Sequence, residues 1–294
     1  MLSMTTFTTT DVPNLNGKTA IVTGANGGIG RSVARDLAAA GARVTLAVRS
    51  IEKGKQAAEG MPGATDIREL DLASLDSVRA FAAAWDGPID LLINNAGVSA
   101  PSLTRTLDGF ESDFGINHLG HFALTNLLLE HITGRVVTLA SQAERLARLD
   151  LEDPNWEHRP FDSRRAYNDS KLANLLFTAE LQRRLAATGS PVLANAAHPG
   201  LVSTNIYNRD GRGFSIWQLL VPLLAQDPDH GALPVLYAAV AHIPGNSFAG
   251  PSHLAHMRGA PELIDRSATA NNPQLADRLW TVSEQLTGIA HQSH

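Results

Sequence analysis

The chain has 294 residues, of which 44% are hydrophobic, so it can bury one large core. A formal net charge of −5, without a long basic run, argues against nucleic acid as a partner. No apolar run is long enough to span a bilayer, and the absence of cysteine excludes disulfides and suits a reducing cytoplasm. We expect a cytoplasmic protein with a flexible, threonine-rich leader at residues 1–13 and one catalytic domain at 14–294.

Strand-like and helix-like segments alternate along the chain. Strands are predicted over residues 18–23, 42–48, 65–70, 89–93, 135–140 and 191–197, with a short edge strand at 248–250. Helices are predicted over residues 31–40, 51–60, 74–85, 107–131 and 167–187. Because the strands are continuously apolar and alternate with helices, the pattern predicts an α/β, doubly wound Rossmann fold. Its mainly parallel, seven-stranded sheet would carry helices on both faces.

A glycine-rich loop follows the first strand and contains Gly24, Asn26, Gly28, Ile29 and Gly30. Glycines let the backbone approach a pyrophosphate, and the N-terminus of the next helix offers free N–H groups to it. A glycine-rich turn alone is weak evidence, since many tight turns look like this. The order strand, loop, helix is typical of a dinucleotide-binding site.

Tyr167 and Lys171 stand four residues apart on a predicted helix and share one of its faces. An isolated tyrosine loses its phenolic proton near pH ~10, too high for acid–base chemistry at neutral pH. A neighbouring ammonium stabilises the phenolate and lowers that pKa. The pair therefore predicts a proton donor, and the alternative is an ordinary surface pair on a helix.

Polar residues follow several predicted strands at their carboxyl ends. They are Asp71, the segment Asn94–Gly97, Ser141 and the segment His198–Gly200. In a sheet of this kind, ligands bind outside the carboxyl ends of the strands. Each residue alone could belong to a strand-end turn, but together they indicate one crevice.

These motifs, in this order and at about these spacings, resemble the short-chain dehydrogenase/reductase family over residues 17–250. Segments 117–122, 167–174, 179–185 and 279–284 resemble its retinol-dehydrogenase-like branch. The motifs are Thr23-Gly-x-x-x-Gly28-x-Gly30, Asp71-Leu72, Asn94-Asn-Ala-Gly97, Asn117, Ser141, Tyr167-x-x-x-Lys171 and Pro199-Gly200.

The resemblance implies catalysis by Asn117, Ser141, Tyr167 and Lys171. Ser141 would position a carbonyl oxygen, Tyr167 would protonate it, Lys171 would lower the Tyr167 pKa and bind the nicotinamide ribose, and Asn117 would hold a water. The resemblance also implies contacts of Asp71 and Leu72 with the adenine, of Asn94 with its ribose, and of residues 199–202 with the carboxamide. The implied cofactor-binding residues are Gly24, Asn26, Gly28, Ile29, Gly30, Arg49, Asp71, Leu72, Asn94, Ala96, Gly97, Tyr167, Lys171, Pro199, Gly200, Val202 and Thr204.

The residue after the second strand bears on the choice of cofactor. An acid at this point would bind the ribose 2′-hydroxyl of NAD, whereas arginine suits a 2′-phosphate. Arg49 stands here, with no acid before Glu52. A two-pronged guanidinium contact favours NADP(H) over NAD(H), and the alternative is a solvated strand-end arginine.

The resemblance implies that two segments, 142–166 and 201–225, wall a substrate cleft, and their apolar content suggests a bulky hydrophobic ketone, aldehyde or alcohol. The alternative is that their aromatic residues only pack a lid against the core. A small-molecule substrate is expected, and no nucleic acid, membrane span or metal; His118 and His121 share a helix face but have no nearby acidic ligand. The resemblance implies a homodimer, paired through the helices that carry Asn117 and Tyr167 and through the last strand, or a monomer, as for members with long insertions.

Two further functions stay open. One is a nucleotide-binding sensor or scaffold with the same fold and no turnover, because a fold does not establish a function. The other is a lyase or dehydratase that uses a bound cofactor internally. Intact Asn117, Ser141, Tyr167 and Lys171 favour the oxidoreductase.

Overall fold

The computed structural model describes residues 6–202 and 226–290. In these ranges eight strands form one sheet, in the order β3-β2-β1-β4-β5-β6-β7-β8. The first seven run parallel, and β8 pairs antiparallel with β7. The strands are β1 (Thr19–Thr23), β2 (Arg43–Val48), β3 (Thr65–Glu69), β4 (Ile89–Asn94), β5 (Ile132–Leu139), β6 (Leu193–Ala197), β7 (Phe248–His253) and β8 (Arg258–Leu263).

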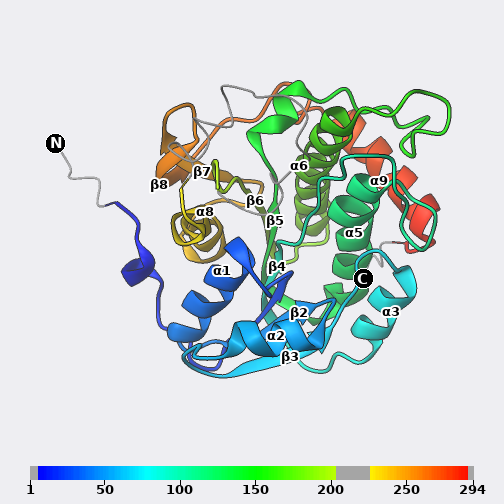
Figure 1. Ribbon diagram of the computed structural model, residues 1–294. Coiled ribbons are helices and arrows are strands. Elements are labelled where there is room, and N and C mark those ends of the chain that lie inside the picture. Colours follow the sequence, from blue (N-terminus) through cyan, green and yellow to red (C-terminus); the bar gives the residue numbers. More distant parts are fainter. Residues whose placement is uncertain (1–5, 203–225, 291–294) are drawn as a thin grey trace.

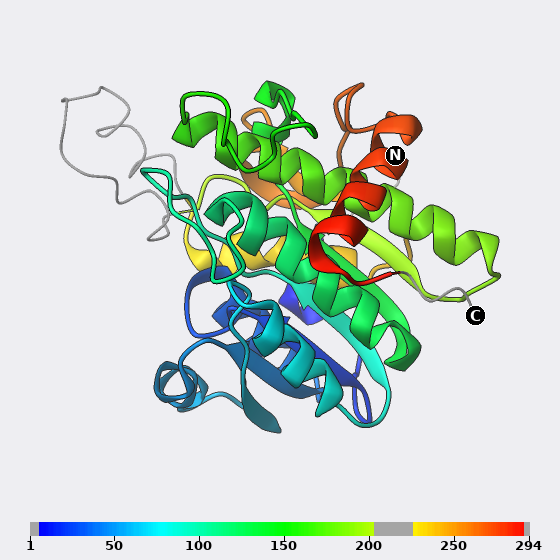
Figure 2. The same ribbon diagram turned by 90° about the vertical axis from the view of Figure 1, so that its right-hand side faces the viewer.

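Helices cover both faces of this sheet (Figure 1). One face carries α1 (Gly28–Ala39), α2 (Ile51–Ala58) and α8 (Pro228–Val240). The other carries α3 (Leu75–Ala83), α5 (Gly120–Leu128) and α6 (Ser163–Ala187), and α9 (Pro273–Thr287) lies against α6 (Figure 2). Shorter turns are η1 (Thr9–Asp11), α4 (Ser112–Phe114), the π-helical η2 (Gly115–Leu119), η3 (Leu129–His131) and η4 (Gln142–Leu146).

The central strands are buried on both faces, as their apolar sequences predict. Val22, Val44 and Ile93 pack against α1 and α8, whereas Ile21 and Leu92 pack against the opposite layer. Alternate residues of a strand point to opposite faces, so one apolar run supplies both cores. The predicted doubly wound α/β fold is confirmed, with eight strands in place of seven.

The sequence does not predict strand β8, because Arg258-Gly-Ala-Pro-Glu-Leu263 contains neither an apolar run nor alternation. It forms the edge of the sheet, where a strand needs only one partner and where glycine, proline and charges are tolerated. Pairing with β7 supplies what the local sequence lacks.

The helix predicted over residues 107–131 begins later and is not uniform. Arg105 and Glu111 form an antiparallel bridge, and Gly109 takes a positive φ of 88°, so the chain turns before the helix. The Glu111 carboxylate then accepts the backbone N–H groups of Asp113 and Phe114, each at 2.8 Å. This side-chain cap sets the start of the helix at Ser112.

Part of the expected leader packs against the domain. Residues 9–11 form η1, and Phe7 packs edge-to-face on Tyr237 of α8 with ring centres 5.3 Å apart. Val12 also packs against the α1–α8 core. An apolar residue at each end of η1 therefore holds this part of the leader on the domain.

Candidate active site

A cleft of about 590 Å³ opens at the carboxyl ends of the strands, beside the point where the strand order reverses between β1 and β4. Ligands of doubly wound sheets bind at such a point. The cleft is lined by most of the predicted cofactor residues: Gly24, Asn26, Gly28, Ile29, Gly30, Arg49, Asp71, Leu72, Ala96, Gly97, Tyr167, Lys171 and Pro199.

The glycine loop has a backbone that other residues adopt with strain. Gly24 and Gly28 have φ values of 65° and 52°. A Cβ on Gly30 would overlap the Asn95 side-chain amide and lie 2.8 Å from the Gly24 carbonyl oxygen. Around Gly27 there is open space. The loop thus wraps closely on the protein side and stays open on the cleft side, which fits a bound pyrophosphate at the start of α1.

The glycine loop is tied to the segment after β4 through Asn95, which the sequence places in the crevice without assigning it a contact. The Asn95 side chain donates to the Thr23 carbonyl at 2.7 Å, and the Thr23 hydroxyl oxygen accepts the N–H groups of Asn95 and Ala96, each at 2.9 Å. Both segments line the cleft. These bonds therefore set the spacing between two of its walls.

His121 links this network to Asn117. Its Nδ1 lies 3.0 Å from the Asn117 carbonyl, which can only accept, so Nδ1 carries the proton. Its Nε2 then accepts from the Thr23 hydroxyl at 2.9 Å. Burial lowers the pKa of His121 to about 4, so the ring is neutral and acts as a bridge between β1 and η2.

Asn117 lies in η2 and is fully buried. Its side-chain oxygen accepts the Val98 N–H at 2.7 Å, and its nitrogen donates to the Val98 carbonyl at 2.9 Å and to the Ser170 hydroxyl at 3.0 Å. Ser170 in turn donates to the Tyr167 carbonyl. Asn117 therefore connects the segment after β4 with the helix that carries Tyr167.

Tyr167 and Lys171 both lie on α6 and line the cleft. The Lys171 ammonium is 5.5 Å from the centre of the Tyr167 ring and donates to the Leu139 carbonyl at the end of β5, at 3.2 Å. Burial lowers the pKa of Lys171 to about 8, and the carboxylate of Asp113 opposes that shift. The predicted pair thus sits at the cleft with its charge in a poorly solvated place.

Ser141 follows β5 and begins the η4 turn, where its hydroxyl accepts the Ala143 N–H at 3.2 Å. This turn is anchored by Glu144, whose buried carboxylate accepts the Ser267 N–H at 2.9 Å and the Ser267 hydroxyl at 2.5 Å. Residues far along the chain thereby hold the Ser141 turn in place.

The prediction for Asn94 needs correction. Its side chain is buried and donates to the Thr125 hydroxyl of α5 at 2.9 Å, and Asn95 lines the cleft in its place. Leu92, two residues earlier on β4, packs against the same helix layer. Because strand side chains alternate, Asn94 faces α5, whereas Asn95 has left the strand.

Of the predicted residues after β6, Pro199 lines the cleft, whereas Gly200 and Val202 do not. Gly200 has a φ of 79°, and Gln226 donates to the Pro199 carbonyl at 2.7 Å. Val202 is buried and forms a parallel bridge with Gln226. Thr204 lies outside the described residues.

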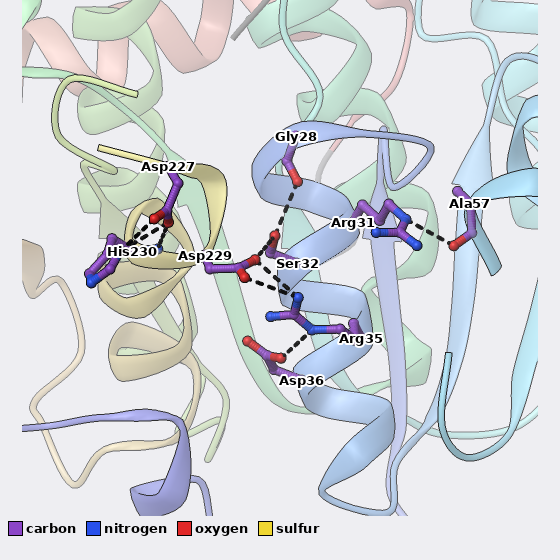
Figure 3. Close-up of polar contacts among 9 residues, drawn as sticks. All are labelled: Gly28, Arg31, Ser32, Arg35, Asp36, Ala57, Asp227, Asp229 and His230. Carbon is purple, nitrogen blue, oxygen red and sulfur yellow. Dashed lines mark hydrogen bonds and ion pairs between the residues drawn. The ribbon is translucent and has the colours of Figure 1, made fainter. Parts of the chain in front are cut away.

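Helix α8 brings Pro228 to the same cleft, and polar contacts hold its first turn against α1 (Figure 3). Asp229 accepts the Ser32 hydroxyl at 2.6 Å and forms an ion pair with Arg35 at 3.0 Å. Asp227 caps the helix by accepting the His230 N–H. The position of Pro228 therefore depends on the helix that follows the glycine loop.

The first segment expected to wall a substrate cleft, 142–166, holds its aromatic residues against other side chains of the protein. Leu151 and Trp156 are buried, Trp156 packs edge-to-face on Phe161, and the Arg159 guanidinium lies 3.9 Å from the Trp156 ring centre. Within the described residues this segment lines none of the 590 Å³ cleft, and its aromatic residues pack on one another and on the protein. Of the second segment, 201–225, all but Leu201 and Val202 lies outside the described residues.

The two histidines that share a helix face have structural partners. His118 Nε2 lies 2.8 Å from the Ser283 hydroxyl of α9, and His121 forms the bridge described above. Among the residues that the structure describes, no three His, Cys, Asp or Glu side chains are grouped to hold a metal ion. None of the helices in the described ranges is both long and apolar enough to cross a membrane.

The fold and the cleft together define a dinucleotide-binding α/β protein with a tyrosine–lysine pair beside the cofactor site. The short chain dehydrogenase family model matches residues 18–212. The chain belongs to the short-chain dehydrogenase family, in its retinol-dehydrogenase-like branch.

Similar proteins support the branch. Retinol dehydrogenase 13 of Homo sapiens is 42% identical, over 93% of this chain and 85% of its own. Retinol dehydrogenase 12 of Mus musculus is 40% identical, over 96% of this chain and 89% of its own. A putative uncharacterized protein from Mycobacterium paratuberculosis, known from a crystal structure, is 48% identical in sequence to this chain. The two structures superpose with a TM-score of 0.87, over 98% of this chain and 100% of that one. The chain is therefore an oxidoreductase that acts on an alcohol or carbonyl group with a nicotinamide cofactor.

Proposed function

We propose that the chain interconverts a carbonyl and an alcohol with NADP(H), and that Tyr167 donates and accepts the proton. The observation that carries this proposal is the Tyr167–Lys171 pair at the cofactor cleft, with the lysine buried. A buried ammonium near a phenol favours the phenolate and so brings the tyrosine into the range of neutral pH.

The side chains present can divide the reaction between them. Ser141 donates a hydrogen bond to the carbonyl oxygen and orients it, and Tyr167 transfers its phenolic proton to that oxygen. Lys171 stabilises the phenolate that remains, and Asn117 holds the segment beside it and a water that returns the proton. When bound, the nicotinamide supplies or removes the hydride. Asp71 and Leu72 would contact the adenine and residues 199–202 the carboxamide.

The protonation state of the Tyr167–Lys171 pair makes the rates of carbonyl reduction and alcohol oxidation depend on pH in opposite ways. Carbonyl reduction needs the proton on the Tyr167–Lys171 pair, so its rate falls as pH rises through the pKa values of the pair. Because the pKa of Lys171 is about 8, we expect this loss to begin near pH 8 and alcohol oxidation to gain over the same range.

The preference for NADP(H) rests on the carboxyl end of β2. Arg49 is exposed there and lines the cleft together with Lys53, from the first turn of α2. Two cations at the ribose end suit a 2′-phosphate, and arginine can hold it with two parallel hydrogen bonds. Lys53 thus supplies a second positive charge in support of the NADP(H) preference that the sequence predicted from Arg49 alone.

The preference is tested by titrating the protein with NADPH and with NADH and following nicotinamide fluorescence. Arg49→Ala should weaken NADPH binding roughly 10- to 100-fold and leave NADH binding unchanged. Arg43→Ala is the matched control, since Arg43 is exposed at the first residue of the same strand, far from the cleft. Tighter binding of NADH than of NADPH to the unaltered protein would refute the assignment.

For the substrate we propose a bulky hydrophobic aldehyde, ketone or alcohol. This proposal is supported by the similarity to several proteins named retinol dehydrogenase, since retinol is a long apolar alcohol. A panel that runs from retinal to short water-soluble ketones tests this, with NADPH consumption compared with alcohol formed. Preference for the short ketones would contradict it. The cytoplasmic location stays a prediction of the composition.

A further inference from the structure

Asp113 is a buried carboxylate beside the active site that the mechanism above does not use. It is 0% exposed and lies in α4, one turn before Asn117. Its Oδ1 accepts the Ala100 N–H at 2.8 Å. A buried carboxylate is costly to keep in a protein unless it has partners, so its surroundings indicate its role.

Asp113 and Asn117 act on the same piece of chain. Asn117 bonds both backbone groups of Val98, and Asp113 bonds the N–H of Ala100. The two side chains therefore hold alternate residues of segment 97–100, as a neighbouring strand would. A Cβ on Gly97 would lie 3.7 Å from the Lys171 ammonium, so this segment rests against the lysine.

The charges around Lys171 make Asp113 distinctive. Two buried histidines, His121 on α5 and His198 after β6, interact electrostatically with Lys171. Burial lowers their pKa values to about 4 and about 3, so both are neutral at pH 7. In the described part of the chain, Asp113 is the carboxylate whose charge acts on the lysine, and it holds the pKa of Lys171 above what burial alone would give.

Other acids near Asp113 have different partners. Glu111 caps the helix through the N–H groups of Asp113 and Phe114, and Asp169 on α6 accepts the Arg148 N–H at 2.7 Å. Burial raises the pKa of both Glu111 and Asp169. Of these three acids, Asp113 is the one whose charge acts on Lys171.

We propose that Asp113 is a positioning residue of the active site, which holds segment 97–100 against Lys171 through its hydrogen bond to Ala100 and places a negative charge beside the Tyr167–Lys171 pair. The proposal rests on the function assigned to that pair above. Asp113 touches no reacting atom; it acts through the segment and through the lysine.

The charge and the hydrogen bond can be separated by substitution. Asp113→Asn removes the charge and keeps an oxygen that accepts from Ala100, whereas Asp113→Leu removes both. Removing a negative charge makes every proton of a nearby group easier to lose. Asp113→Asn should therefore lower the pH at which Tyr167 ionises by about 0.5 unit or more. Asp113→Leu should in addition weaken NADPH binding roughly tenfold, because segment 97–100 lines the cleft.

The ionisation of Tyr167 is read from the ultraviolet absorbance of tyrosinate during a pH titration, after subtraction of the same titration of Tyr167→Phe. This needs no substrate, so a failure to reduce any carbonyl would count against the proposed function alone. Glu111→Gln is the matched control, since it neutralises a buried acid on the same turn and should leave the midpoint unchanged. Should Asp113→Asn not fold, Asp113→Ser removes the same charge. An unchanged midpoint in a folded, neutral variant would overturn the proposal.

Discussion

At the scale of single residues, close contacts determine which side chains the cofactor cleft tolerates. Gly30 lies against the Asn95 amide, which is itself bonded to the Thr23 carbonyl. Gly27, three residues earlier in the same loop, has an extended backbone and no atom near the position of a Cβ. Two glycines of one motif thus meet very different surroundings.

We predict that Gly30→Ala lowers the free energy of unfolding of the cofactor-free protein by about 1–3 kcal/mol, because the new methyl group must displace Asn95. Gly27→Ala should change it by less than about 0.5 kcal/mol. Urea unfolding of the two variants and the unaltered protein measures both values. Equal stabilities of the two variants would contradict this account of the loop.

The same contacts show how far a sequence motif predicts a site. The glycines, Asp71, Tyr167 and Lys171 line the cleft as expected, since each follows a strand or shares a helix face. Asn94 does not, because a motif gives spacing and not the direction of a side chain; counting alternation from Leu92 could have placed it correctly. No sequence motif marks Asp113, because its position beside the active site becomes visible only through its hydrogen bond to Ala100 in the folded chain.

At the scale of elements, α9 closes the layer formed by α5 and α6. Trp280 is buried, stacks on Phe177 and packs edge-to-face on Phe122. His118 on η2 forms a hydrogen bond with Ser283 of α9. Burial lowers the pKa of His118 from its ordinary value of 6.5 to about 3, so the imidazole buried between η2 and α9 is neutral at pH 7.

Burial of the neutral His118 ring makes the stability of the fold depend on pH. Between pH 6.5 and about 3 the unfolded chain binds a proton at His118 and the folded protein does not, so stability falls as pH falls through this range. From pH 7 to pH 5 the loss due to His118 is on the order of 2 kcal/mol. His118→Asn lacks this loss.

The measurement is chemical unfolding at pH 7 and pH 5. The stability gap between the unaltered protein and His118→Asn should narrow on going to pH 5. His242→Asn, at an exposed histidine, is the control and should leave the pH dependence as it is. A gap that stays constant for His118→Asn would show that the ring is not kept neutral by burial.

Elements also show which parts of the fold lay outside sequence patterns. The apolar strands and the Tyr167 helix can be predicted from sequence periodicity. The start of α4 at Ser112 instead depends on the Glu111 side chain, and β8 depends on its pairing with β7. Both are decided by contacts that no local pattern contains.

At the scale of the whole molecule, the α5–α6 face is already used within the chain. We expected a dimer through these helices or a monomer, and α9 lies against α6 with its tryptophan buried. Pairing of two chains through this face would require α9 to leave and expose Phe122 and Phe177 to water.

We therefore predict that the protein is a monomer in solution. Size-exclusion chromatography with light scattering should give the mass of one chain across micromolar concentrations. A stable dimer in which cross-links join the α6 helices of two chains would contradict the prediction.

The central claim is that Tyr167 carries the proton in an NADP(H)-dependent carbonyl–alcohol interconversion. The most direct test is Tyr167→Phe, with turnover and NADPH binding measured on the same preparation. We predict that turnover falls roughly 100-fold or more while NADPH binding is kept, because the ring stays and only the proton donor is lost. A variant that kept most of its turnover would contradict the mechanism.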